Sequence, residues 1–153
     1  MKALLLVPLL LLIGCPSGTN QQKAANAAKN VAVFLQQSQQ AELTVFNNGQ
    51  SCLQTAADKL SCIVITTQEH VFIEEQFKTL AEADKTLDSC IRVATNTAGI
   101  VTCVNSAVVT VDQLNSQGAL YLKSDKAKST YAAVMTAVKL GIQTVSTVLG
   151  GVS

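Results

Sequence analysis

The chain has 153 residues, with eleven basic and ten acidic side chains and a net charge of +1. This balance produces no long-range field that would attract nucleic acid, so we expect no nucleic-acid partner. Aromatic residues make up 4% of the chain and tryptophan is missing, which disfavours a surface that stacks on sugar rings.

The N-terminal segment combines a basic residue, Lys2, with an apolar run over residues 3–13 that is interrupted only by Pro8. The run is shorter than the roughly 20 apolar residues that span a bilayer. Its length is typical of the central part of a signal peptide. We therefore expect residues 1–14 to be a signal peptide that is removed, which leaves about 140 residues, the size of one domain.

The residues Leu12-Ile13-Gly14-Cys15 come at the end of this apolar run. They resemble the lipobox of bacterial lipoproteins, in which a small residue precedes a cysteine. The resemblance implies cleavage before Cys15, a diacylglycerol on its sulfur and acylation of the new amino terminus. The alternative is a plain secretory signal in which this cysteine occurs by chance. Several acyl chains anchor a protein stably, so we expect a lipid-anchored protein at a membrane surface of the cell envelope, periplasmic or extracellular.

Residues 15–20 are expected to form the lipidated tether, and residues 21–151 a single helical domain. Its first helix is predicted over Gln21 to Asn47, and Asn48-Gly49 should end it. The evidence is that apolar or small residues recur at steps of three and four, as on one helix face: Ala24, Ala27, Val31, Phe34, Ser38, Ala41 and Val45.

The connection after this helix is long, from Gly49 to Ile65, and it could hold a short helix over Leu53 to Leu60. Four cysteines besides Cys15 are expected to form two disulfides in an oxidising compartment. Their spacing contains no Cys-x-x-Cys pair, so we predict no redox motif, metal site or cofactor. These cysteines are Cys52, Cys62, Cys90 and Cys103.

The second helix is predicted from Thr67 to Thr95, because Thr66 and Glu69 have the spacing of a capping box. Its expected buried face is Ile73, Phe77, Leu80, Asp84, Leu87, Ile91 and Ala94.

A third helix is predicted to start at about Thr97, with Gly118 as its C-terminal cap. Its expected buried face is Ile100, Val104, Ala107, Val111 and Leu114.

The fourth helix is predicted over Thr130 to Leu149, after Ser124-Asp125, with Gly150-Gly151 ending it. Its expected buried face is Tyr131, Met135, Val138, Ile142, Val145 and Leu149. The last two helices are rich in Val, Thr and Ile, which favours strands by propensity. However, an alternating pattern leaves neither face consistently apolar, so we predict helices. We also weighed a membrane-active role for the fourth helix and favour core packing, because polar residues interrupt it.

Four long amphipathic helices joined mostly by short connections predict an all-α, up-down-up-down antiparallel bundle. Cys90 and Cys103 lie equidistant from a turn centred on Asn96 and Thr97, so we expect them to bond to each other. Cys52 and Cys62 should then close the long connection between the first two helices. The competing pairings would tie that connection to the second helical hairpin.

The only histidine, His70, lies four residues before Glu74 on one helix face, so the pair could share a weakly bound metal ion. The alternative is a solvated first turn, where acidic residues suit the positive end of the helix dipole. We favour the solvated turn, because a di-iron bundle site needs two histidines and this chain has one.

Asp84 falls on the apolar face of the second helix, where a buried carboxylate could mark a ligand or proton-handling site. Ala83 could instead take the core position, and we favour a solvated Asp84 for this reason. The neighbouring charges are expected to form ordinary surface pairs: Glu82, Lys85, Asp88 and Arg92.

No catalytic constellation emerges from these motifs, so we expect a protein that is not an enzyme. The leading hypothesis is a membrane-tethered interaction or structural module with an envelope protein as its partner. The alternative is a carrier that holds a small apolar ligand in a cavity between the helices, where Ala24, Ala27, Ala28 and Ala107 could leave space.

Overall fold

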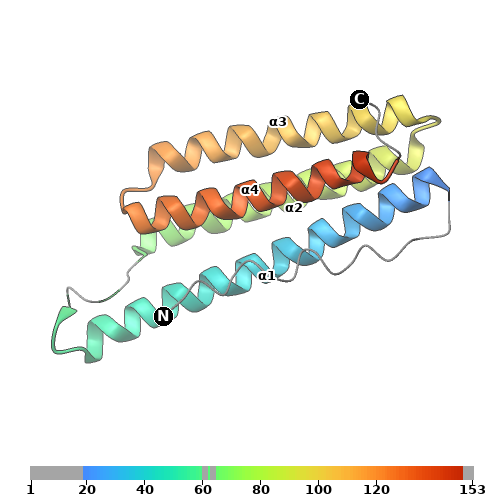
Figure 1. Ribbon diagram of the computed structural model, residues 1–153. Helices are drawn as coiled ribbons and strands as arrows, with labels where there is room; N and C mark the ends of the chain where they lie inside the picture. Colours follow the sequence, from blue (N-terminus) through green and yellow to red (C-terminus); the bar gives the residue numbers. More distant parts are fainter. Residues whose placement is uncertain (1–18, 60–61, 63–64, 150–153) are drawn as a thin grey trace.

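The computed structural model describes residues 19–59, 62 and 65–149. Figure 1 shows four long helices lying side by side along their lengths. The described part of the chain contains no strand, which confirms the all-α prediction. The helices are α1 (Asn20–Thr55), α2 (Thr67–Val93), α3 (Thr97–Tyr121) and α4 (Asp125–Thr147).

Each helix packs against two neighbours, so the four apolar faces meet in one core. Helix α1 contacts α2 and α4, and α3 contacts the same two helices from the other side. The predicted faces supply most of this core, and its largest fully buried side chains are Leu80, Leu87, Ile91, Leu122, Met135, Val111, Val138 and Val145.

Contacts at both ends of α2 define how it lies against α1. The side-chain amide of Gln21 donates to the carbonyl oxygens of Ile91 at 3.0 Å and Ala94 at 3.4 Å. At the other end, His70 contacts Glu42. The start of α1 therefore lies beside the end of α2, and the first turns of α2 lie beside the later turns of α1.

Helix α1 is longer than predicted, and the expected stop at Asn48-Gly49 is wrong. The helix continues to Thr55, and Gly49 is buried inside it. A glycine in a helix interior costs roughly 1 kcal/mol, and packing around a buried position can outweigh that cost. Leu53 is consequently part of α1 and does not begin a separate short helix.

The ends of α3 and α4 also differ from the prediction. Helix α3 passes through Gly118 to Tyr121, because Gly118 is buried against the ring of Tyr131 and does not act as a cap. Helix α4 begins at Asp125, five residues before Thr130, because Ser124 accepts a hydrogen bond from the N–H of Ala127 at 3.0 Å and caps the helix there. The predicted start signal at Ser124-Asp125 is thereby confirmed.

The start of α2 and the turn before α3 follow the predicted signals. Thr66 and Glu69 form both hydrogen bonds of the capping box, which confirms that prediction. Asn96 caps α3 by accepting a hydrogen bond from the N–H of Gly99 at 2.9 Å. Capping residues fix helix ends because they satisfy N–H groups that have no partner within the helix.

Both predicted disulfide pairs are present. Cys52 bonds to Cys62 and Cys90 bonds to Cys103, each with a Cα–Cα distance of 5.8 Å. The first bridge joins the last turns of α1 to the connection that follows it. The second bridge joins the end of α2 to the start of α3 across the Asn96 turn.

Within the described residues, α3 is the helix that is long and apolar enough to cross a membrane by length and composition, with a mean hydropathy of 1.2. One third of that apolar stretch is buried in the core. Its buried part packs against α2 and α4.

Candidate functional site

His70 and Glu42 form a half-buried pair between α1 and α2. The Nδ1 atom of His70 lies 3.0 Å and 3.1 Å from the two carboxylate oxygens of Glu42. Their side chains are only 12% and 8% exposed, respectively. The prediction of a solvated first turn is therefore wrong for His70, because α1 covers this side of α2.

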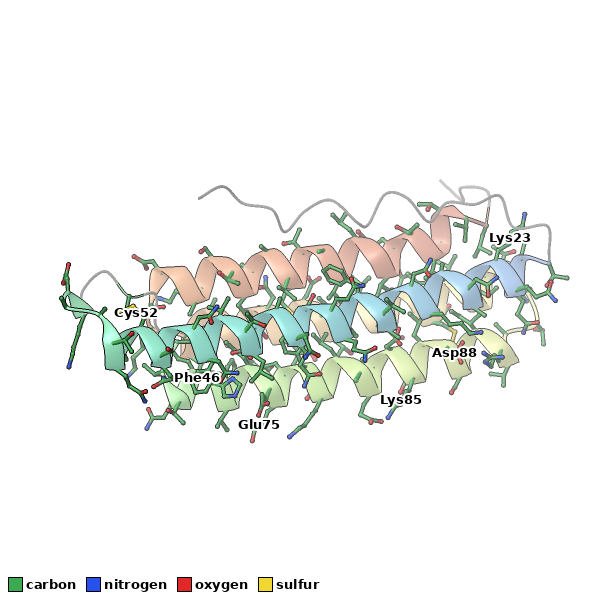
Figure 2. All side chains as sticks on the ribbon, turned by 90° about the horizontal axis from the view of Figure 1, so that it is seen from below. Lys23, Phe46, Cys52, Glu75, Lys85 and Asp88 are labelled. Atoms are coloured by element: carbon green, nitrogen blue, oxygen red, sulfur yellow. A yellow bond between two sulfur atoms is a disulfide. The ribbon has the colours of Figure 1, made fainter. Side chains whose placement is uncertain are left out.

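Phe46 completes the surroundings of the imidazole. Its ring stacks on that of His70 with centroids 4.0 Å apart and planes 8° from parallel. Figure 2 shows Phe46 towards the end of the molecule where Cys52 lies, with Lys23 and Asp88 towards the other end. An aromatic face held this close fixes the ring of His70 and shields its hydrogen bond from water.

The charges around Glu42 partly offset its burial. Burial raises the pKa of Glu42, the hydrogen bond and charge of His70 lower it, and nearby Glu74 raises it, so the net pKa is above the usual value. The Nε2 atom of His70 lies 3.8 Å from Glu74. Each imidazole nitrogen thus faces a carboxylate.

The alternative of a metal ion between His70 and Glu74 gains no support from this arrangement. Within the described ranges, no group of three or more His, Cys, Asp or Glu side chains is placed to hold a metal ion. A single histidine with two carboxylates in a stacked, covered position is suited to joining α1 to α2 by hydrogen bonds.

A surface groove lies between the first turns of α2 and the end of α3, on the side of α2 that does not contact Glu42. Its volume is about 400 Å³. The rings of Phe72 and Tyr121 stack with centroids 4.3 Å apart and form its apolar wall. Val71 and Tyr121 are 48% and 47% exposed, so their apolar atoms face solvent. The residues that line the groove are Thr67, Gln68, Val71, Phe72, Glu75 and Tyr121.

Glu69 holds the two elements of this groove together. Its carboxylate accepts hydrogen bonds from the N–H groups of Thr66 at 3.0 Å, Lys123 at 2.9 Å and Ser124 at 3.4 Å. Burial raises the pKa of Glu69, but these hydrogen bonds outweigh that effect and lower the net pKa. The start of α2 is thereby fixed to the turn between α3 and α4.

Asp84 is buried, which contradicts the prediction that it is solvated. Its side chain lies on the core face of α2 with 8% exposure, and its Oδ1 atom has no hydrogen-bond partner among the described residues. Burial raises the pKa of Asp84 to about 6, and the charge of Asp88 adds to the shift.

The predicted surface pairs on α2 are confirmed. Lys85 lies 2.7 Å from Glu82, and Arg92 lies 2.7 Å from Asp88. The pair of Lys85 and Glu82 is exposed and contributes little to stability, whereas Asp88 is half-buried.

Two predictions, the lipidation site and the ligand carrier, are not tested by the described residues. The expected lipidation site, Cys15, lies outside the described residues. The carrier hypothesis requires a cavity between the four helices, whereas the groove lies on the surface between α2 and α3. The carrier hypothesis stays a prediction.

Comparisons with protein-family models, with curated proteins and with solved structures find no match to this chain.

Proposed function

We propose that the chain is an exported lipoprotein of the bacterial cell envelope and that its helical part is a non-catalytic interaction or structural module. The observation that carries the proposal is Leu12-Ile13-Gly14-Cys15 at the end of a short apolar run behind Lys2. Two disulfides agree with an oxidising compartment, since cytosolic thiols are kept reduced.

The helical part is proposed to be an up-down-up-down antiparallel bundle. The contacts of Gln21 with Ile91 and of Glu42 with His70 support opposite directions for α1 and α2. The bridge between Cys90 and Cys103 supports the same relation for α2 and α3. Such a bundle is rigid along its length, as a spacer or a docking module requires.

The position of the groove suits a tether at the N-terminal end of α1. Thr19 caps α1 only four residues after Cys15, so lipidation would hold this end of the bundle near the membrane. Glu42 contacts His70, which lies in the same turns of α2 as the groove. With a rise of 1.5 Å per residue, Glu42 lies about 33 Å from Asn20 along α1. In this arrangement, the aromatic groove lies far from the tethered end of the bundle.

The lipid anchor is tested by Cys15→Ala in the full chain. We expect the variant to leave the membrane fraction and to lose metabolic labelling by a fatty acid, because the acylated sulfur is removed. Ser17→Ala is the matched control, since it changes the same segment but leaves the lipobox intact, and it should fractionate and label like the wild type.

Two outcomes contradict the proposal. Unchanged labelling and membrane association of Cys15→Ala would exclude lipidation at this residue. Free thiols at all four of the other cysteines in protein isolated from the envelope would argue against export.

A further inference from the structure

The outer side of α3 and α4 carries almost no charge. Residues 97–121 contain one ionisable acid or base, Asp112, apart from Tyr121, and residues 131–147 contain only Lys139 besides Tyr131. These two bind each other, with Lys139 Nζ 2.8 Å from both carboxylate oxygens of Asp112. The charges therefore cancel at one point where the two helices meet.

The residues that share this side at helical spacing define the α3–α4 face. Apart from Asp112 and Lys139 they are uncharged, and each is exposed or half-buried. Helix α2 differs, because its solvent side carries repeated charges, and Figure 2 shows Glu75 and Lys85 pointing away from α1. A solvated helix face normally carries such charges. Besides Asp112 and Lys139, the α3–α4 face consists of Asn105, Val108, Ser116, Ala119, Ala132, Thr136, Gln143 and Ser146.

Two large aliphatic side chains lie beside the ion pair. Val109 is 55% exposed and Leu140 is 54% exposed. Val109 precedes Asp112 by one helical turn, and Leu140 directly follows Lys139. Removing both from water is favourable if another apolar surface covers them.

We propose that a second copy of this chain covers the α3–α4 face in a two-fold symmetric dimer. The two-fold axis runs parallel to the helices, outside the face and midway between α3 and α4. Rotation by 180° about this axis places the copy's α3 over α4 and keeps every residue at the same height along the axis. The charged groups of Asp112 and Lys139 are at one height because they bind each other. The copy's Asp112 therefore lies over Lys139, and the copy's Lys139 lies over Asp112.

The same axis brings the exposed aliphatic side chains together. Tyr131 packs on Gly118 and Lys139 binds Asp112. Residue numbers therefore rise along α4 in the direction in which they fall along α3. Val109 and Leu140 consequently lie on the same side of the ion pair, at heights about 3 Å apart. The copy's Val109 then rests against Leu140, and both matches arise twice in one isologous interface.

The size of the α3–α4 face fits this partner. From Asn105 to Ala119 on α3 and from Ala132 to Ser146 on α4, each helix contributes about 20 Å of length, and the uncharged residues 97–104 lengthen α3 alone to about 33 Å. With each helix about 10 Å wide, these lengths give a footprint of roughly 500 to 550 Å². This is below the roughly 800 Å² per partner of an average stable interface but reaches the roughly 500 Å² per partner that a specific interface needs.

The test uses charge exchange in the full chain, purified in detergent from the membranes of producing cells and weighed by native mass spectrometry. The wild type should have twice the mass of one chain. Asp112→Lys places two cations on the face and Lys139→Asp places two anions there. Each variant alone should lose dimer by roughly tenfold or more, because like charges oppose each other across the axis.

Mixing the two variants is the decisive step. When the two are produced together with tags of different mass, Asp112→Lys and Lys139→Asp should form the mixed dimer at the wild-type level, since every cation again faces an anion. The matched controls are Glu82→Lys and Lys85→Glu, which break the exposed pair on α2 and should leave the dimer intact.

A monomeric wild type, a dimer that survives in either face variant, or a mixture that stays monomeric overturns the proposal. Recovery of the mixed dimer also shows that both variants fold, so loss of the single-variant dimers cannot be attributed to misfolding. Dissociation in the α2 controls would place the interface on α2 and would equally overturn it.

Discussion

Asp84 lies between Leu80 and Leu87 on the core face of α2, and its carboxylate is removed from water. Burial, aided by the charge of Asp88, raises its pKa to about 6, above the value of about 3.9 for an exposed aspartate. The folded state therefore binds this proton more tightly than the unfolded state. Stability from this group is fully present below about pH 4 and is lost as the pH rises through about 6.

Neutralising Asp84 should stabilise the protein above its folded pKa. We expect Asp84→Asn to raise the free energy of unfolding at pH 8 by about 1 to 3 kcal/mol, because the amide avoids burying a charge. At pH 4 the gain should vanish. Urea unfolding followed by circular dichroism at both pH values measures the difference.

Glu82→Gln is the control for Asp84→Asn, since the Glu82 side chain is 71% exposed. It should change stability by less than about 0.5 kcal/mol at either pH. A gain for Asp84→Asn that is equal at pH 4 and pH 8 would show that ionisation is not its cause.

At the scale of the helices, the contact between Gly118 and Tyr131 sets how closely α3 approaches α4. The ring of Tyr131 occupies the space that a Cβ atom on Gly118 would fill. The Tyr131 hydroxyl donates to the carbonyl oxygen of Leu114 at 3.0 Å, and burial raises the pKa of this hydroxyl, which keeps it a donor. The glycine therefore permits close packing and a buried hydrogen bond together.

Gly118→Ala should destabilise the protein by about 1 to 3 kcal/mol, because the added methyl group displaces the Tyr131 ring. Without such a contact, alanine in a helix is favoured over glycine by up to about 1 kcal/mol. Gly141→Ala is the matched control, since its Cβ would meet only Val31 Cγ2 at 3.4 Å. Urea unfolding compares the two, and a stabilised Gly118→Ala would contradict the packing argument.

The bridge between Cys90 and Cys103 fixes the second connection. Replacing both with alanine should lower the free energy of unfolding by about 2 to 3 kcal/mol, because the unfolded chain gains freedom. The helical circular dichroism signal should remain, since the apolar faces are unchanged. Loss of that signal, or a stability equal to that of the wild type, would contradict this account.

For the molecule as a whole, the features that depend on nearby residues were predictable from the sequence. The apolar faces of α2, α3 and α4 follow from spacing of three and four residues, and the cap of α2 follows from Thr66 and Glu69. On α1 the same spacing located the helix, but Ala28, Leu35 and Glu42 are buried where Ala27, Phe34 and Ala41 were expected. The pairing of Cys90 with Cys103 followed from symmetry about the Asn96 turn. Each of these signals lies within a few turns of one helix or hairpin.

The features that were missed depend on residues that are distant in sequence. Glu42 lies 28 residues from His70, so helical spacing around the histidine gave no sign that it is covered. Phe72 and Tyr121 form the groove only after α2 and α3 have packed. At Asp84, spacing allowed either this residue or Ala83 to face the core, because a helical face is wider than one residue.

The contact between α1 and α4 also affects the order in which the chain can fold. All other main helix contacts join helices that follow each other in sequence, and both disulfides close short loops. Such local contacts form quickly because little entropy is lost in closing the chain. Two helical hairpins can therefore form early, whereas the first helix must wait for the last to emerge before its remaining apolar surface is covered.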